Sequence, residues 1–473
     1  MSRVALVTLG CDKNTVDSEK YLADLLAHGA THVAEAGEAD VVIINTCGFI
    51  DAAKQESIDA IVEAGRLKGG GRVQAVFAIG CMIERHKDEL VEALPEIDCF
   101  LGTSETDRLV PELLERGLLE SNAYLAHPGT RLYAGDAPHV RYLKISEGCD
   151  HGCAFCAIPL MRGKHRSFAL PEIVREAQLL ELQGAREVSL VAQDLAHYGR
   201  DRRDGVGLAE LLEALVRETS IPWIRNLYLY SAGITPRLLD VIAAHPRILR
   251  YLDMPMQHGA DAVLQRMRRP ERQRTILEKV ALYRSVVPEL TIRTTCIVGF
   301  PGETDAEFEQ LLELLEQLKL DRVGAFTYSP QDGTRAMAMA DDVPESVKYE
   351  RLERLNELQR SITAERYERW IGATVPLLVD QPRDVNGLLE TRAPWQADGI
   401  DGVTWVSDAR EPAPAIERGS LIEAVIEDVV DDYDFTARLV RVLDRPVAAP
   451  RASRALPLAP SSAEPTTMGA FGR

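Results

Sequence analysis

Three cysteines lie close together near the middle of the 473-residue chain, in the segment Cys149-Asp-His-Gly-Cys153-Ala-Phe-Cys156. Three thiolates in one loop can each hold one iron of a four-iron cluster. The fourth iron would then have no protein ligand, and an open coordination position lets a metal centre bind and activate a small molecule. The spacing therefore predicts a catalytic 4Fe-4S cluster at Cys149, Cys153 and Cys156.

Cys153 and Cys156 taken alone would also suit half of a zinc site or a thioredoxin-like redox pair. A zinc knuckle needs a second pair of ligands at short spacing, and the sequence after Cys156 contains none. Cys149 precedes these two cysteines at the spacing of a three-cysteine cluster motif, and a barrel-like strand pattern follows them. An iron–sulfur cluster is therefore the better interpretation.

Three more cysteines occupy equivalent places in the first part of the chain. Each follows a predicted strand: Cys11 comes after residues 4–9, Cys47 after 41–45, and Cys81 after 73–79. In a parallel sheet the carboxyl ends of neighbouring strands lie about 4.8 Å apart on one edge, so the three loops can converge. We predict a second 4Fe-4S cluster here, again with one free iron; buried structural thiols are the alternative.

The elements that must position these cysteines give an α/β fold with several domains. Residues 1–125 alternate strands and helices, which predicts a parallel sheet. Residues 135–345 contain six predicted strands with intervening helices, which suits a full or partial TIM-like barrel whose working face lies at the carboxyl ends of its strands. Both cysteine trios are predicted at such ends.

The last part of the chain changes in character. Residues 346–370 form a predicted linking helix, and residues 371–442 contain short strands interrupted by Gly, Pro and Asp, which predicts a small β-barrel. Residues 443–473 are rich in Ala, Pro, Ser and Arg without periodicity, so we expect a disordered tail.

Composition limits the class of protein. Eight cysteines are too few for a disulfide scaffold in a chain of this length and favour metal chemistry in a reducing compartment. The first residues lack a signal-peptide core and no window resembles a membrane span, so we expect a cytoplasmic protein without a membrane partner. The formal net charge of −19 disfavours a specific DNA partner and favours basic ones.

With both trios and the domain order in view, residues 1–442 resemble the radical S-adenosylmethionine methylthiotransferases. The resemblance implies that the cluster at Cys149, Cys153 and Cys156 binds S-adenosylmethionine and generates a 5′-deoxyadenosyl radical. It also implies that the N-terminal domain holds an auxiliary cluster that supplies sulfur, that the C-terminal barrel is a TRAM domain that recognises the substrate, and that flavodoxin or ferredoxin supplies electrons.

Branches of this family differ in substrate. The segments Gly10-Cys-Asp-Lys-Asn-Thr-Val-Asp-Ser-Glu19, Met256-Gln-His258 and Met267-Arg-Arg-Pro270 resemble the branch that modifies an aspartate β-carbon in ribosomal protein S12, free or within the small ribosomal subunit. Residues 371–442 hold 14 acidic and six basic residues, a net charge of −8 that suits a basic protein better than RNA. The alternatives are a transfer RNA adenosine 2-methylthiotransferase and, in another class, a zinc-stabilised ribosome-binding module without catalysis.

Other residues are weaker candidates for cofactor contact. They either adjoin the cysteine loop or stand at ends of predicted barrel strands: Phe155, Gln193, Asp194, Arg293, Gly299 and Gly302. A strand-to-helix turn would explain the glycines equally, and a barrel-interior ion pair would explain Arg293. For the arginines between 266 and 274 an exposed helix start is favoured over an RNA contact. Cys99 and Cys296 fit neither trio, and Cys296 reads as a core thiol.

Overall fold

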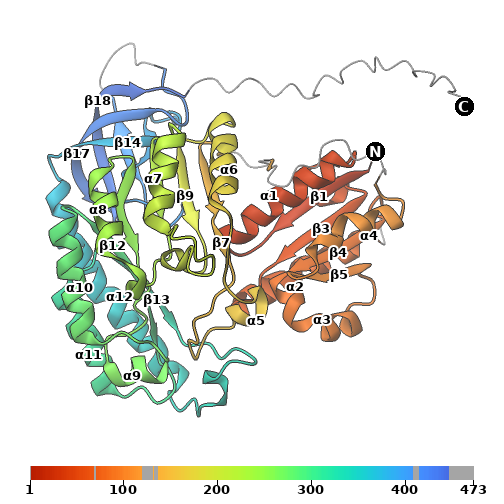
Figure 1. The fold of residues 1–473 in the computed structure, drawn as a ribbon, viewed down its shortest axis with the longest axis horizontal. Coiled ribbons are helices and arrows are strands. Elements are labelled where there is room, and N and C mark those ends of the chain that lie inside the picture. The colour runs from red at the N-terminus through yellow and green to blue at the C-terminus, as the bar shows by residue number, and fades with distance from the viewer. Residues whose placement is uncertain (1, 69–70, 120–130, 133–136, 409–414, 447–473) are drawn as a thin grey trace, which may run out of the picture.

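A computed structural model describes residues 2–68, 71–119, 131–132, 137–408 and 415–446 of the chain (Figure 1). The N-terminal domain, the central sheet with its helices, and a C-terminal β-barrel follow one another along the chain, in the α/β arrangement that the sequence predicts. Among the described helices, none has the length and apolar character needed to cross a membrane.

The N-terminal domain is a parallel sheet with helices on both faces. Its strands are β1 (Arg3–Thr8), β2 (Thr31–His32), β3 (Val41–Thr46), β4 (Ala75–Gly80) and β5 (Cys99–Gly102), in the order β2-β1-β3-β4-β5. Its helices are α1 (Asp12–Ala27), α2 (Asp51–Lys68), α3 (Cys81–Ala93) and α4 (Leu109–Glu115). Strands β3 and β4 are buried along their whole length, as the apolar runs at residues 41–44 and 75–79 predict. The edge strands β2 and β5 have only two and four residues and were not predicted from the sequence.

The central domain is an open parallel sheet of six strands, hence a partial barrel. The strands are β6 (Val140–Lys144), β9 (Glu187–Val191), β10 (Trp223–Asn226), β11 (Ile248–Asp253), β12 (Thr291–Val298) and β13 (Arg322–Thr327), in the order β13-β12-β11-β10-β9-β6. The helices of the outer layer include α6 (Leu170–Leu182), α7 (Leu208–Glu218), α8 (Pro236–Ala244), α10 (Gln273–Val286) and α11 (Asp305–Leu318). Shorter elements are β7 (Ser146–Glu147), α5 (Ile158–Arg162), β8 (Arg166–Ser167) and α9 (Asp261–Arg266).

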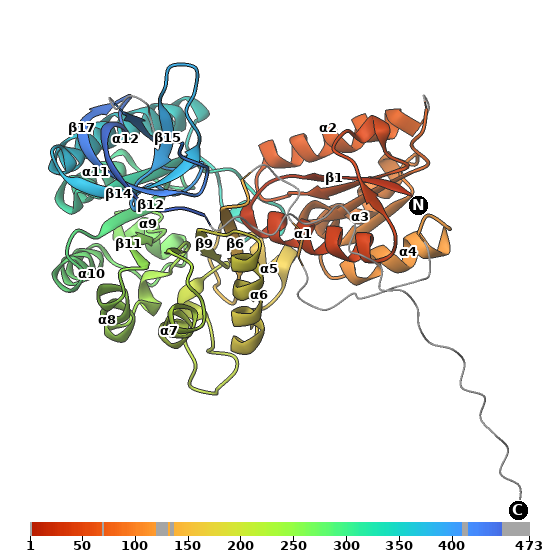
Figure 2. The ribbon, with the colours of Figure 1, turned by 90° about the horizontal axis from the view of Figure 1, so that it is seen from above.

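Helix α1 of the N-terminal domain lies against β6, at the edge of this open sheet (Figure 2). Its Val16 packs with Trp223 and Tyr251 of the sheet and with Leu378 of the C-terminal barrel in one buried cluster. These apolar contacts join the three domains. They lie in a region that a closed barrel would cover with its own strands.

Helix α12 (Glu345–Tyr367), followed by a 3-10 turn, leads into the closed C-terminal barrel, as predicted. The barrel strands are β14 (Thr374–Gln381), β15 (Leu389–Arg392), β16 (Thr404–Ser407), β17 (Leu421–Val430) and β18 (Asp434–Asp444). Because β18 continues to Asp444, the first residues of the predicted tail belong to the barrel; residues 447–473, the rest of that prediction, lie outside the described residues.

A buried charged network attaches the C-terminal barrel to the central sheet. Glu187 of β9 is fully buried and accepts hydrogen bonds from Arg225 of β10, at 2.6 Å, and from Arg392 of β15, at 2.7 Å. Arg392 also donates to Asp380, which lies 2.8 Å from the Nε2 atom of His139. Each buried charge in the network thereby has an opposite charge beside it.

Candidate iron–sulfur centres

The three N-terminal cysteines stand at the carboxyl ends of three adjacent strands. Cys11 follows β1, Cys47 follows β3 and Cys81 begins α3 directly after β4, and these strands are neighbours in the sheet. A Cβ atom added to Gly10 would lie 2.7 Å from the Cys47 sulfur, so the loop before Cys11 needs glycine to pass this close. The structure brings the three loops to one edge, as the sequence predicts.

Local hydrogen bonds fix the backbone around this trio. The Cys47 N–H donates to the Ser57 hydroxyl, and that hydroxyl donates back to the Cys47 carbonyl oxygen. Asn14 donates through Nδ2 to the carbonyl oxygens of Leu9 and Thr46, which ties the end of β1 to the end of β3. The carboxyl edge of the sheet is therefore rigid at the positions where the thiols emerge.

The central trio lies in the loop after β7, at the carboxyl end of the barrel strand β6. Cys149, Cys153 and Cys156 are all partly exposed, and none of the described cysteines is joined in a disulfide. The Cys149 N–H donates to the carbonyl oxygen of Gly163, which closes the loop on itself. The three thiols can therefore be reached by an inorganic core.

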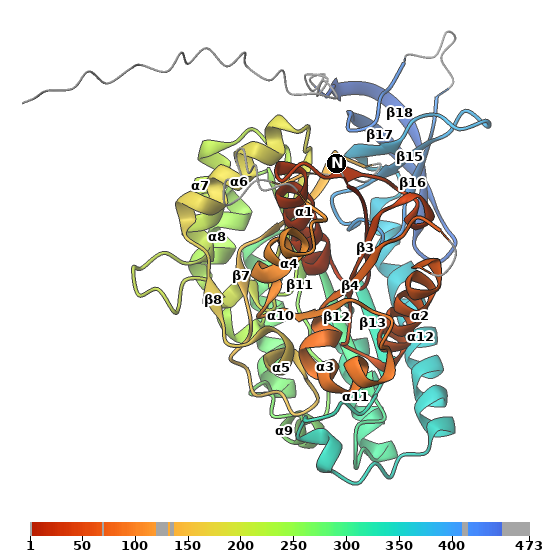
Figure 3. The same cartoon turned by 90° about the vertical axis from the view of Figure 1, so that its right-hand side faces the viewer.

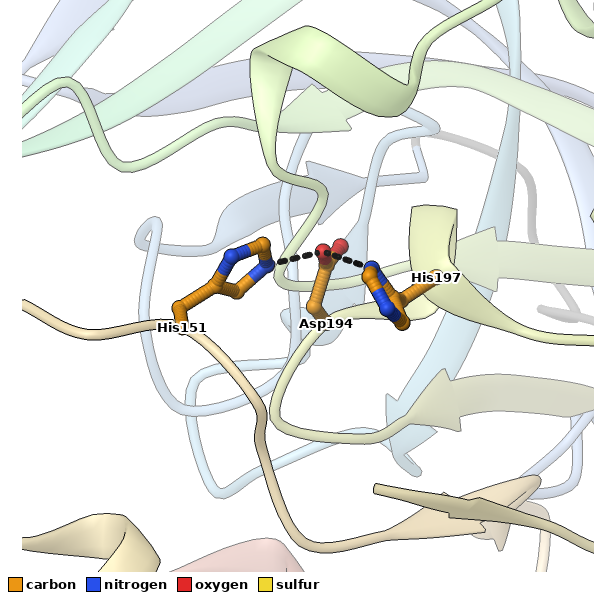
Figure 4. Close-up of side chains that lie close together, drawn as sticks. All are labelled: His151, Asp194 and His197. Atoms are coloured by element: carbon orange, nitrogen blue, oxygen red, sulfur yellow. Dashed lines mark hydrogen bonds and ion pairs between the residues drawn. The ribbon is translucent and has the colours of Figure 1, made fainter. Parts of the chain in front are cut away.

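A histidine–carboxylate contact holds this loop to the barrel. His151, between the first two cysteines, has its Nε2 atom 2.8 Å from an oxygen of Asp194 (Figure 4). The other oxygen of Asp194 accepts from the backbone N–H groups of Ala196 and Tyr230. His151 also stacks on the Tyr230 ring, with 4.1 Å between ring centroids, and His197 approaches from the other side of Asp194. Both Asp194 oxygens are thus engaged by protein atoms, which gives this residue a positioning role the sequence did not predict.

Hydrogen-bond donors are aimed at five of the six cysteine sulfurs. Backbone N–H groups two residues farther along reach Cys47, Cys149 and Cys156. Arg162 reaches Cys81 at 3.1 Å, and Arg269 approaches Cys153 at 3.8 Å. Donors of this kind stabilise thiolates and tune iron–sulfur clusters.

Arg269 corrects one expectation. The arginines between 266 and 274 were expected to form an exposed helix start, but Arg269 is only 4% exposed. Its guanidinium stacks 3.8 Å from the centroid of the Tyr230 ring and donates to Glu271 and to the Pro255 carbonyl oxygen. The sequence signal was available in the Met267-Arg-Arg-Pro270 segment, but local charge alone could not reveal which arginine turns inward.

Burial raises the pKa of four of these thiols: Cys47, Cys81 to about 12, Cys149 to about 11 and Cys156 to about 12. A buried thiol with such a pKa is a poor nucleophile. The hydrogen-bond donors that point at these sulfur atoms, however, would interact most strongly with a thiolate. A positively charged iron at the same place would favour the thiolate form. The donor set therefore fits two iron–sulfur clusters, one in each trio.

The N-terminal trio reaches the interface with the segment that follows the central trio. Cys81 packs with Ala157, which directly follows Cys156, and with Met161 in a small buried cluster. Figure 3 shows α3, which begins at Cys81, and α5, which carries Met161, side by side. The two domains that carry the candidate clusters thereby pack together at this interface.

The other predicted cofactor contacts have protein partners in the structure. Gln193 donates to Glu147, and Arg293 pairs with Asp253 at 3.1 Å and with Asp401 at 3.5 Å, so the barrel-interior ion pair is present. A Cβ atom on Gly299 would lie 2.3 Å from the Lys348 side chain, which accounts for glycine there.

Gly302 has a φ of +73° in a strand-to-helix turn, and Phe155 packs against the buried cluster around Phe300 and Tyr328. Contact of the cofactor with the six predicted residues stays a prediction: Phe155, Gln193, Asp194, Arg293, Gly299 and Gly302. Cys296 is fully buried in β12, which confirms the core thiol, and Cys99 begins β5 away from either trio.

Comparisons with known proteins agree with this domain order. The model of the Uncharacterized protein family UPF0004 matches residues 3–102, and that of the Radical SAM superfamily matches residues 143–315. A "Ribosomal protein uS12 methylthiotransferase RimO" from Desulforudis audaxviator (strain MP104C) is 42% identical over 451 residues, 93% of this chain and 98% of that protein. The protein of the same name from Anaeromyxobacter sp. (strain K) is 40% identical over 467 residues, 98% of this chain and 97% of its own.

Among solved structures, the radical S-adenosylmethionine methyltransferase TsrM from Kitasatospora setae, with tryptophan and a SAM analog bound, has a TM-score of 0.55 and 14% identity. The likeness covers 76% of this chain and 89% of that chain. At this identity it shows a common fold.

Proposed function

Because the chain belongs to the family of ribosomal protein uS12 methylthiotransferases, which are radical S-adenosylmethionine enzymes, we propose that it adds a methylthio group to the β-carbon of an aspartate in that ribosomal protein. The observation that carries the proposal is the packing of one cysteine trio against the segment that follows the other, with Cys81 in contact with Ala157 and Met161. A methylthio transfer needs a sulfur source and a radical source within reach of one substrate atom.

In this proposal the six cysteines bind the two clusters. When bound, the clusters and S-adenosylmethionine supply the electron, the methyl group, the radical and the sulfur. The chain itself holds the central loop through Asp194 and His151, and directs Arg269 toward Cys153. The apolar contact of Cys81 with Ala157 and Met161 holds the N-terminal trio against the segment that follows the central trio.

Charge supports a basic protein substrate. The acidic turn of the barrel, here the last residues of β17 together with those that join it to β18, carries four exposed acids: Glu427 and Asp428 in the strand, and Asp431 and Asp432 after it. An acidic surface attracts a Lys/Arg-rich ribosomal protein and repels the phosphates of transfer RNA. We therefore place the substrate on this barrel, and propose cytoplasmic action with a flavodoxin-type or ferredoxin-type electron donor.

The experiment is anaerobic reconstitution with iron and sulfide, followed by incubation with S-adenosylmethionine, a reductant and either ribosomal protein uS12 or transfer RNA. Mass spectrometry should find the methylthio increment on an aspartate of the protein. The Cys149→Ala variant should yield no product, whereas Cys99→Ala should match the parent. An increment on transfer RNA alone would favour the transfer RNA branch; bound zinc without iron or sulfide would favour the non-catalytic module.

A further inference from the structure

Arg162 is the last residue of α5, six positions after Cys156, yet its side chain reaches the other trio. Its Nε atom lies 3.1 Å from the Cys81 sulfur, across the boundary between the central and N-terminal domains. A second guanidinium nitrogen donates to the side-chain oxygen of Asn14, three residues after Cys11. A single side chain of α5 thus contacts one cysteine of the N-terminal trio and one residue beside that trio.

Two carboxylates hold the guanidinium in this position. Arg162 donates to Asp17 at 2.7 Å and to Glu147 at 3.1 Å, and its side chain is 7% exposed. Lys144 donates to the same two carboxylates, so Asp17, Glu147, Lys144 and Arg162 form a group of two negative and two positive charges. An arginine guanidinium does not lose its proton in a protein, and with two carboxylates beside it Arg162 stays charged.

A fixed positive charge and an N–H donor beside a cluster sulfur favour the more negative, one-electron-reduced state of that cluster. We propose that Arg162 is a positioning residue that raises the reduction potential of the N-terminal cluster through its hydrogen bond to Cys81. This inference rests on the proposed cluster at Cys11, Cys47 and Cys81. Through this side chain the central domain would directly control the redox state of the cluster in the sulfur-supplying N-terminal domain.

Arg85 provides a matched control for the loss of an interdomain arginine. It lies on α3, four residues after Cys81, and donates to the carbonyl oxygens of Gly48 and Asp332 and, at 3.4 Å, to Gln331. These contacts also join the N-terminal and central domains, but the acceptors are oxygen atoms. A shift in potential that came only from a loosened interface should therefore occur in Arg85→Gln as well.

The test uses the full chain with Cys149, Cys153 and Cys156 all changed to Ala, so that only the N-terminal cluster is assembled. Iron and sulfide analysis first establishes that cluster, and a redox titration followed by electron paramagnetic resonance then gives its midpoint potential. Arg162→Gln, which removes the charge, should lower the one-electron reduction constant at least tenfold, which is 59 mV. Arg162→Lys, which keeps a charge but loses the planar donor, should give a smaller shift in the same direction.

Arg85→Gln should leave the potential at the parent value. If Arg162→Gln cannot be obtained folded, the Arg162→Lys comparison decides. An unchanged midpoint in the Arg162 variants, or an equal shift in Arg85→Gln, would overturn the inference. Absence of any cluster in the parent background would instead refute the proposed function, so the two failures are distinguishable.

Discussion

The carboxylate of Asp194, at the end of β9, lies 2.8 Å from the Nε2 atom of His151, in the loop between Cys149 and Cys153. Since Asp194 is itself fixed by two backbone N–H groups, the contact transmits the rigidity of the barrel to the cysteine loop. A partner of this kind is expected to matter for metal binding even though it touches no ligand sulfur.

Asp194→Asn should weaken iron binding at the central trio by roughly 10- to 100-fold, because outer partners of metal ligands have effects of that size. The measurement is cluster occupancy at limiting iron, from iron and sulfide content and visible absorption. Asp204→Asn is the control, since Asp204 is exposed and contacts Arg202 and Val206. Equal occupancy in both variants would contradict the proposed tether.

The cysteines should divide into three groups when they are changed to Ala. Loss of the central trio should halve the iron content, and loss of the N-terminal trio should halve it as well. Cys99→Ala and Cys296→Ala should keep the full content, although Cys296 is fully buried and its loss should lower stability by about 1 kcal/mol. A loss of iron in either of these two variants would contradict the assignment.

Glu187→Gln should destabilise the attachment of the C-terminal barrel by about 3 kcal/mol, because it leaves the buried guanidinium groups of Arg225 and Arg392 without full compensation. The midpoint of urea unfolding measures the effect. Glu316→Gln, at an exposed position of α11, should have a midpoint within error of the parent. A midpoint for Glu187→Gln that matched this control would show that the network adds little.

Acid should weaken the interface around Asp17. Burial alone would raise the pKa of Asp17, but the attraction of Lys144 and Arg162 outweighs burial and lowers the pKa to about 2. A carboxyl with a lowered pKa stabilises the fold above its unfolded pKa of about 4, and this contribution, roughly 2 kcal/mol, is lost as pH falls toward 2.

We therefore expect Asp17→Asn to be less stable than the parent at neutral pH, with a difference that shrinks below about pH 4. Thermal unfolding of cluster-free protein gives the comparison, because acid dissolves iron–sulfur clusters. A difference that stayed constant down to about pH 3 would mean that Asp17 is not held in the ionised form by its partners.

The acidic turn of the C-terminal barrel should act in substrate capture. Reversing charge in a Glu427→Lys, Asp428→Lys double variant should lower kcat/KM for the ribosomal protein by about twofold to tenfold, and added salt should reduce the difference. The control is Glu313→Lys with Glu316→Lys, a pair of exposed positions on α11. An equal loss of kcat/KM in both double variants would show that the acidic turn does not take part in substrate binding.

The two trios could be predicted because each depends on strand order and local spacing. Cys11, Cys47 and Cys81 follow strands that are adjacent in the sheet, and the βαβ rule places such ends on one edge. The small C-terminal barrel was also predictable, because its β-rich runs are interrupted by Gly, Pro and Asp.

The side chains that support the trios were not predictable in the same way. Arg162 contacts Cys81 across 81 positions of sequence, and Arg269 contacts Cys153 across 116. Such contacts depend on how two domains pack, which local periodicity does not encode. Asp194 shows the same limit. A carboxylate at the end of a strand can contact a ligand or pair with a histidine, and the sequence does not distinguish the two.

The placement of α1 beside β6 constrains how such enzymes can be recombined. Lys144 and Arg141 of β6 find their counter-charges in Asp17 and Glu19 of α1, a helix that starts one residue after Cys11. A chimera that exchanged the first domain would take the Glu19 carboxylate from the buried Arg141 and leave Lys144 with one of its two carboxylate partners, Glu147, unless the graft also carried acids at both positions. A compatible N-terminal domain must therefore carry an acid at the positions of Asp17 and Glu19, which gives protein engineers a simple rule for choosing donors.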